Sequence, residues 1–188
     1  MSLLSPDQKR SLLRLSRATL EAAFQGDGRA PLEAFEADAK NLEGEVSKHH
    51  PCFVTLQTVS GKLRGCIGSM VTFNPLYLNV FHMTRQAAFE DPRFRRVEAE
   101  EVSDLKIHIA VLGPLRPLAS LEELEIGKQG LHVAYGPRRG VLLASVAVDH
   151  GMSKEEFLRE TCHKAGLDPA KVSHYEVKTF DEISFGEE

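Results

Sequence analysis

Two side chains capable of chemistry stand two residues apart in the segment 63–68, which reads Leu-Arg-Gly-Cys-Ile-Gly. Alternate residues of a β-strand point to the same side of a sheet, so we expect Arg64 and Cys66 to project together. A guanidinium beside a thiol stabilises the thiolate, which suits a cysteine nucleophile or an anion-binding pocket with sulfur in its wall. Two simpler interpretations stay open: a free cysteine often packs as a small hydrophobe, and Arg64 could pair with a surface carboxylate.

Two glycines, Gly65 and Gly68, lie inside the same segment. Glycine has no side chain to pack in a strand and loses more conformational entropy on folding than any other residue. Such glycines often mark a bulge or a place where a ligand approaches the backbone. We therefore place Gly65 and Gly68 among the candidate ligand-binding residues.

The segment 91–96, Asp-Pro-Arg-Phe-Arg-Arg, is the second candidate. In a functional interpretation, a loop at a helix end offers Arg93 to an anion while Asp91 orients it. The alternative is an ordinary turn, because aspartate and proline are common turn residues, and we favour it. Acidic residues within 98–101 follow the arginines, so these charges can pair with one another instead of forming a nucleic-acid surface.

His108 is a weak candidate for a general base, because it lies on the polar side of an alternating strand. A solvent-facing histidine is the simpler interpretation. The run 49–52 and the pair Cys162-His163 contain metal-ligating residue types without the spacing of a zinc site. The sequence also contains no phosphate-binding loop, dinucleotide fingerprint or serine-hydrolase motif. We expect neither a metal nor a cofactor.

A hairpin is predicted to position the first group. Residues 52–58 read as a strand, 63–68 as its partner and 60–61 as a two-residue turn. That turn places Thr55 opposite Cys66 and Gln57 opposite Arg64, so these four residues share one polar face. The other face should join the core, and it carries Val54, Leu56, Leu63 and Ile67.

Helical and strand patterns alternate along the rest of the chain. We predict a helix capped by Ser5 that stops at Gly26, a helix capped by Asn74 that ends before Asp91, and a helix that begins at the capping box of Ser153 and ends at 165. A weaker helix is predicted within 31–44 and a short one at 120–124. Strands are predicted at 105–111, 131–135, 140–146 and 175–179. Hairpins outnumber parallel crossovers. The expected fold class is therefore α+β, with a mainly antiparallel sheet flanked by helices.

Composition places the chain among globular proteins. Its 188 residues include 23 Lys and Arg and 27 Asp and Glu, giving a net charge of −4, with 42% hydrophobic and 27% charged residues. This length predicts one domain or two small subdomains, with internal boundaries most plausible near 113–117 or within 31–50. The composition excludes a disordered chain, and the acidity gives no reason to expect nucleic-acid binding.

Apolar segments are short. The longest nearly uninterrupted one, Val141–Val148, is far below the length of a membrane span. The first seven residues contain no secretory signal core. Because three cysteines without a signal peptide indicate reduced thiols, we expect a cytoplasmic protein that does not bind membranes.

The six residues at 63–68 match every position of the signature of the AMMECR domain family, proteins named after a chromosomal region linked to Alport syndrome and midface hypoplasia. The chain resembles this family along its whole length. Further blocks that match lie at 12–17, 53–56, 91–94, 130–131, 140–143, 157–158 and 162–167.

The resemblance implies an α+β fold of two unequal subdomains, with the signature near a cleft between them. It also implies association, in many prokaryotes, with a Memo-like protein and a radical S-adenosylmethionine (SAM) protein. It supplies neither an established reaction nor catalytic residues. This chain departs from the common family pattern at His108, Ala110, Ala144 and Ser145. If those positions line a functional cleft, the ligand differs from the family norm.

Three hypotheses follow. The first is a binding or accessory module that uses the polar hairpin face, with Asp91 and Arg93 at its rim, to bind a small anion or a segment of a partner protein. The second is an enzyme with Cys66 as nucleophile, Arg64 as thiolate stabiliser and His108 as base. The third, nucleic-acid binding, ranks lowest because of the net charge of −4. The oligomeric state stays open.

Overall fold

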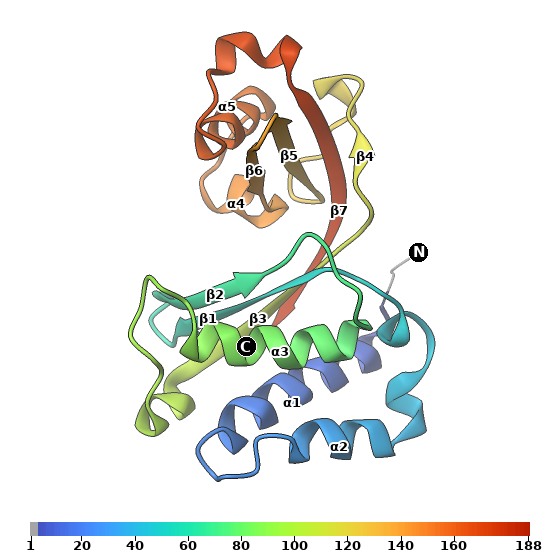
Figure 1. The fold of residues 1–188 in the computed structure, drawn as a ribbon, viewed down its shortest axis with the longest axis vertical. Coiled ribbons are helices and arrows are strands. Elements are labelled where there is room, and N and C mark those ends of the chain that lie inside the picture. The colour runs from blue at the N-terminus through green and yellow to red at the C-terminus, as the bar shows by residue number, and fades with distance from the viewer. Residues whose placement is uncertain (1–3) are drawn as a thin grey trace. The chain divides into compact units, whose positions relative to one another are not determined.

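The computed structural model describes residues 4–188, which divide into two compact units (Figure 1). The first unit contains the described part of residues 1–111 together with Ser184–Glu188, and the second contains Leu112–Ile183. Residues 1–3, part of the segment read for a secretion signal, lie outside the described residues. Helices and antiparallel strand pairs occur in both units, which confirms the α+β prediction.

Three α-helices belong to the first unit: α1 (Pro6–Ala22), α2 (Ala30–Ala37) and α3 (Leu76–Phe89). The 3₁₀ turns η1 (Ala39–Leu42), η2 (Gly44–Ser47) and η3 (Ala99–Asp104) accompany them. The predicted start of α1 is confirmed, because Ser5 and Gln8 form a capping box. The predicted cap of α3 is wrong: Pro75 is the N-cap, and Asn74 N–H donates instead to Thr72 in the preceding loop.

The strands of the first unit are β1 (Cys52–Thr58), β2 (Leu63–Gly68) and β3 (Leu105–Leu112), whose last residue falls in the second unit. β1 lies in the middle and pairs with both neighbours. One face packs on α3, which in turn packs on α1 (Figure 1). The buried positions on that face alternate along the strands, as period-two patterning requires, and include Val54, Leu56, Ile107 and Ile109.

The hairpin between β1 and β2 differs from the prediction at its turn. Thr58 N–H donates to the Lys62 carbonyl, so the loop has three residues rather than two, and Gly61 in it has a φ of 81°. Thr55 pairs with Cys66 as predicted, but Gln57 pairs with Leu63. The extra loop residue shifts the register, and a β-bulge at Arg64 absorbs the shift.

The second unit contains β4 (Arg116–Pro117), β5 (Gln129–Tyr135), β6 (Arg138–Leu142) and most of β7 (Glu176–Gly186). β5 pairs with β6 and β7, and β4 pairs with β7. The helical segments are α4 (Ala144–Asp149), α5 (Lys154–Lys164), η4 (Leu121–Glu123) and η5 (Pro169–His174). Its core is built around Leu131 and Phe157 in one cluster and Val133 and Cys162 in another.

Two predictions for the second unit have opposite outcomes. The capping box at Ser153 is confirmed, with Glu156 as its reciprocal partner. The strand predicted over 140–146 is wrong in its second half, because the chain enters α4 at Ala144, whose N–H donates to the Glu182 carboxylate. Within residues 4–188, no helix is both long enough and apolar enough to span a bilayer.

Candidate functional site

The backbone of Cys66 is held by two side chains of the segment 91–96. Asp91 Oδ2 accepts the Cys66 N–H at 2.8 Å, and Arg93 Nη2 donates to the Cys66 carbonyl at 3.1 Å. Because both polar groups of Cys66 bond outside the β1 ladder, Cys66 and Thr55 form a non-hydrogen-bonded pair with close side chains. The two candidate segments of the sequence therefore meet at Cys66.

Asp91 also fixes its neighbour Arg93. Its carboxylate accepts Arg93 N–H at 3.1 Å, Nε at 3.0 Å and Nη2 at 2.7 Å. The Asp91 side chain is only 2% exposed, whereas that of Arg93 is 55% exposed. The hydrogen bond from Arg93 is the main cause that holds the pKa of Asp91 well below its ordinary value. The pair is thus a buried anion with a half-exposed cation, and the contacts to Asp91 and Cys66 leave Arg93 Nη1 unused.

The Cys66 thiol is half-buried, and its sulfur accepts a hydrogen bond from the Thr55 hydroxyl at 3.1 Å. On the other side of Thr55, β3 places His108 directly opposite. The three residues therefore form one row across three strands, with Thr55 in the middle. Two strand spacings separate Cys66 from His108, about 10 Å, so the expected Cys66–His108 pair does not form.

The guanidinium of Arg64 points away from Cys66 and binds the segment 95–101. Its Nε and Nη2 donate to the Glu101 carboxylate at 2.9 and 3.0 Å, and Nη1 and Nη2 donate to the carbonyls of Arg95 and Arg96. The hydrogen bond from Arg64 is the main cause that lowers the pKa of Glu101 to about 2. Arg64 is buried and its donors are occupied, so it contacts neither the Cys66 sulfur nor an open surface.

Packing inside the first unit accounts for both glycines of the signature. A Cβ on Gly65 would stand 2.1 Å from the Ala87 carbonyl oxygen of α3. A Cβ on Gly68 would stand 2.2 Å from the Phe53 ring. Neither distance is compatible with a larger residue, so close packing explains these glycines without any ligand. The bulge also moves Gln57 away from Arg64, to a position opposite Leu63.

One exposed feature next to the signature was missed by sequence reasoning. Phe73, in the loop between β2 and α3, is 87% exposed, and Val71 beside it is exposed too. The loop is ordered by hydrogen bonds from Thr72 to the buried Asn79 and from Asn74 to Thr72. An apolar residue in a short loop reads as a core residue, and no local signal reveals that it points outward.

Comparison with known proteins places this arrangement in a family. Residues 13–185 match the family model described as AMMECR1. The chain belongs to the AMMECR1 family. The AMMECR1 match spans the candidate residues of both segments, and it agrees with the resemblance carried by 63–68.

Similar AMMECR1-family proteins come from archaea and bacteria. A protein of Thermococcus gammatolerans is 38% identical over 91% of this chain and 88% of its own length. One of Aquifex aeolicus is 38% identical over 84% of this chain and 80% of its own length. The crystal structure of an uncharacterized protein, PH0010 from Pyrococcus horikoshii, is 29% identical, covers 100% of this chain and 95% of that one, and superimposes with a TM-score of 0.82.

The four positions that we expect to depart from the common AMMECR pattern fall in two places. His108 and Ala110 lie on β3, opposite Thr55 and Phe53, on the sheet face that carries Cys66. Ala144 and Ser145 lie at the start of α4 in the second unit. Among residues 4–188, no group of three or more His, Cys, Asp or Glu side chains is placed to hold a metal ion.

Proposed function

We propose that this protein is an accessory module that binds a segment of a partner protein through the Cys66 face of the β1–β2 hairpin and the loop that follows it. The observation that carries the proposal is Phe73, an aromatic side chain held 87% exposed by an ordered loop. Burial of a phenylalanine contributes about 1.5–3 kcal/mol, and aromatic residues are enriched in protein interfaces.

The polar part of the proposed surface consists of Cys66, Thr55 and Arg93. The buried Asp91 fixes the orientation of Arg93 before any partner arrives, which lowers the entropy cost of binding. Nη1 of Arg93 is directed by the same pair and suits a carboxylate of the partner. The preferred partner segment therefore combines an apolar side chain with an acidic one.

Strand addition is not the mode that this geometry supports. β2 has β1 on one side, and on its other side the segment 91–101 occupies the strand edge. The Cys66 N–H donates to Asp91, and the Cys66 carbonyl accepts from Arg93. The Arg64 side chain binds Glu101. A partner therefore contacts side chains rather than free backbone groups of β2.

The resemblance names the partners to test first, a Memo-like protein and a radical SAM protein from the same genome. Isothermal titration of each against this chain measures the affinity. We expect Phe73→Ser and Arg93→Gln to weaken binding at least about tenfold, which corresponds to 1.4 kcal/mol. Tyr135→Ser, which changes a 57% exposed aromatic of the second unit, is the matched control. Equal affinities for all variants would rule out this surface.

The alternative, a cysteine-dependent enzyme, rests on the same thiol. A nucleophilic cysteine needs a general base within hydrogen-bond reach. Here Cys66 accepts from the Thr55 hydroxyl, and His108 lies beyond Thr55. A Cys66→Ser variant that keeps full partner affinity but loses an activity of the complex would favour the enzyme over the module.

A further inference from the structure

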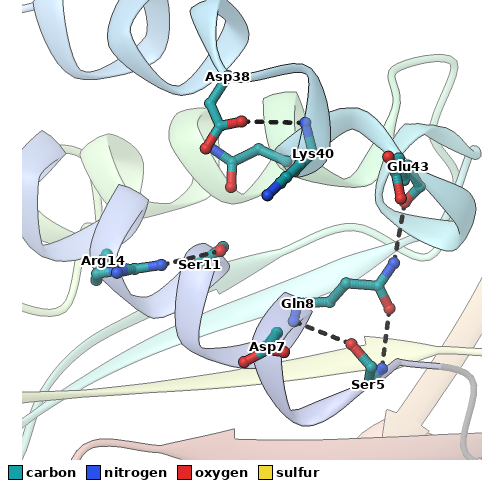
Figure 2. A pocket seen from close by; sticks show the side chains of 9 residues that line it. Ser5, Asp7, Gln8, Ser11, Arg14, Asp38, Lys40 and Glu43 are labelled. Carbon is teal, nitrogen blue, oxygen red and sulfur yellow. Dashed lines mark hydrogen bonds between the residues drawn. The ribbon is translucent and has the colours of Figure 1, made fainter.

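A groove between α1 and the segment 31–43 of the first unit has no role in the proposed function. A cavity of about 510 Å³ opens between the first turns of α1 and the segment 38–43 (Figure 2). A second cavity of about 310 Å³ adjoins it, and the two share Ser11, Arg14, Asp38 and Asn41 in their walls. The two cavities therefore form one continuous groove between α1 and α2.

Charged side chains of both signs line the first cavity. Arg14 comes from α1 and Lys40 from η1, while Asp38 and Glu43 provide carboxylates (Figure 2). None of these four side chains forms an ion pair within residues 4–188, whereas Asp7 beside them is paired with Arg10. Two unpaired cations and two unpaired carboxylates around one cavity leave room for a ligand that carries both charges.

Local hydrogen bonds orient the Arg14 and Asp38 side chains without neutralising them, and they order the backbone of the segment 38–43. Arg14 Nη2 donates to the Ser11 hydroxyl at 3.2 Å. Asp38 Oδ1 accepts the Lys40 N–H at 3.1 Å and so caps η1. Gln8 Nε2 donates to the Glu43 carbonyl at 2.9 Å and ties the two walls together (Figure 2).

The second cavity is the apolar end of the groove. Its walls include Leu15, Ala18, Pro31, Ala34 and Phe35. Leu15 and Phe35 belong to the core, so this end is firmly supported from below. Small-molecule sites commonly combine apolar walls with a few placed polar groups, and this groove separates the two along its length.

We propose that the groove binds a free α-amino acid with an apolar side chain. The carboxylate of the ligand lies beside Arg14 and Lys40, and its ammonium group lies beside Asp38. The side chain extends into the end lined by Ala18, Pro31 and Ala34, above the buried Leu15 and Phe35. The second cavity, of about 310 Å³, has room for a leucine-like side chain. This site is separate from Cys66 and does not depend on the proposed function.

Nuclear magnetic resonance titrations of the full chain with three probes test the proposal. The probes are L-leucine, 4-methylpentanoate, which lacks the ammonium group, and 3-methylbutylamine, which lacks the carboxylate. We expect leucine to bind at least about tenfold more tightly than either analogue, with shifts at the amides of Ser11 and Asn41. Either analogue binding as tightly as leucine, or leucine leaving these amides unshifted at its solubility limit, overturns the proposal.

Variants assign the two charges separately. Arg14→Gln should reduce the preference for leucine over 3-methylbutylamine, and Arg14→Gln combined with Lys40→Gln should remove it. Asp38→Asn should remove the preference over 4-methylpentanoate, and asparagine keeps the capping role. Arg159→Gln is the control, because Arg159 lies on α5 in the second unit, outside the groove. If Arg159→Gln weakens leucine binding as much as Arg14→Gln does, the groove is not the site.

Discussion

The carboxylate of Asp91 lies 2.8 Å from the backbone nitrogen of Cys66, although 25 residues separate the two in the chain. This hydrogen bond is one of several that join the two segments that the sequence marks as candidates. It anchors β2 where its backbone would otherwise face solvent, and it turns a buried anion toward the residue whose thiol stays accessible. The first prediction concerns this bond.

Replacement of Asp91 by asparagine should lower the free energy of unfolding at neutral pH by about 1–3 kcal/mol, since hydrogen bonds to a charged acceptor are lost. The pKa of Asp91 in the folded protein lies below its ordinary value of 3.8. The carboxylate therefore contributes stability above about pH 4, and that contribution is lost as the pH falls through the folded pKa.

Urea denaturation at pH 7 and at pH 3 measures this effect. The difference in the free energy of unfolding between wild type and Asp91→Asn should be smaller at pH 3 than at pH 7. Asp7→Asn, at an exposed carboxylate of α1, is the control and should change stability little. An equal difference at both pH values would contradict the claim that the ionised carboxylate of Asp91 supplies this stability.

Arg64 should behave as a residue of folding rather than of binding. Arg64→Lys loses the two-pronged contact with Glu101 and the bonds to the carbonyls of Arg95 and Arg96, because one ammonium cannot replace a planar fork. We expect a loss of about 1–3 kcal/mol in thermal or urea unfolding. The affinity of the folded variant for the partner should stay near that of wild type. A loss of affinity at unchanged stability would instead show that Arg64 belongs to the binding surface.

The signature glycines should tolerate no side chain. Gly65→Ala forces a Cβ against the Ala87 carbonyl and Gly68→Ala forces one into the Phe53 ring, and overpacking of this kind costs about 1–3 kcal/mol or more. Gly113→Ala is the control, because its Cβ meets nothing closer than 3.5 Å. Differential scanning calorimetry compares the three variants. If Gly65→Ala melts at the same temperature as wild type, the contact with the Ala87 carbonyl relaxes without cost.

The three cysteines should differ sharply in reactivity. Cys52 and Cys162 are buried, and desolvation raises the pKa of both thiols, that of Cys52 to about 12. Only the thiolate reacts with iodoacetamide, so the native protein should gain a single label at Cys66. Mass spectrometry of intact and digested protein locates it, and Cys66→Ala should remove it. An unlabelled Cys66 in the native protein would mean that the thiol is only structural.

Local patterns in the sequence were sufficient for most of the fold. The capping boxes at Ser5 and Ser153, the end of α3 before Asp91-Pro92 and the pairing of Thr55 with Cys66 all depend on residues within a few positions or on strand alternation. The strand predicted through Val146 was wrong, because Ala144–Asp149 forms a helix whose first N–H finds its acceptor in Glu182.

The candidate site depended more on distant partners. From its spacing alone, Arg64 belongs beside Cys66, but the three-residue loop and the bulge shift the register, and Glu101, 37 residues away, takes the guanidinium. Ala87 and Phe53 likewise explain glycines that looked like openings for a ligand.

The amino-acid sequence by itself determined most of the secondary structure, the α+β class and the family, because periodicity, caps and motifs are properties of neighbouring residues. Only the tertiary structure decided that Arg64 binds Glu101, that Asp91 holds Cys66 and that Phe73 points outward. A side chain with several donors, or an apolar residue in a loop, can form contacts of similar free energy with many different partners. Which one it takes is set by how distant segments pack.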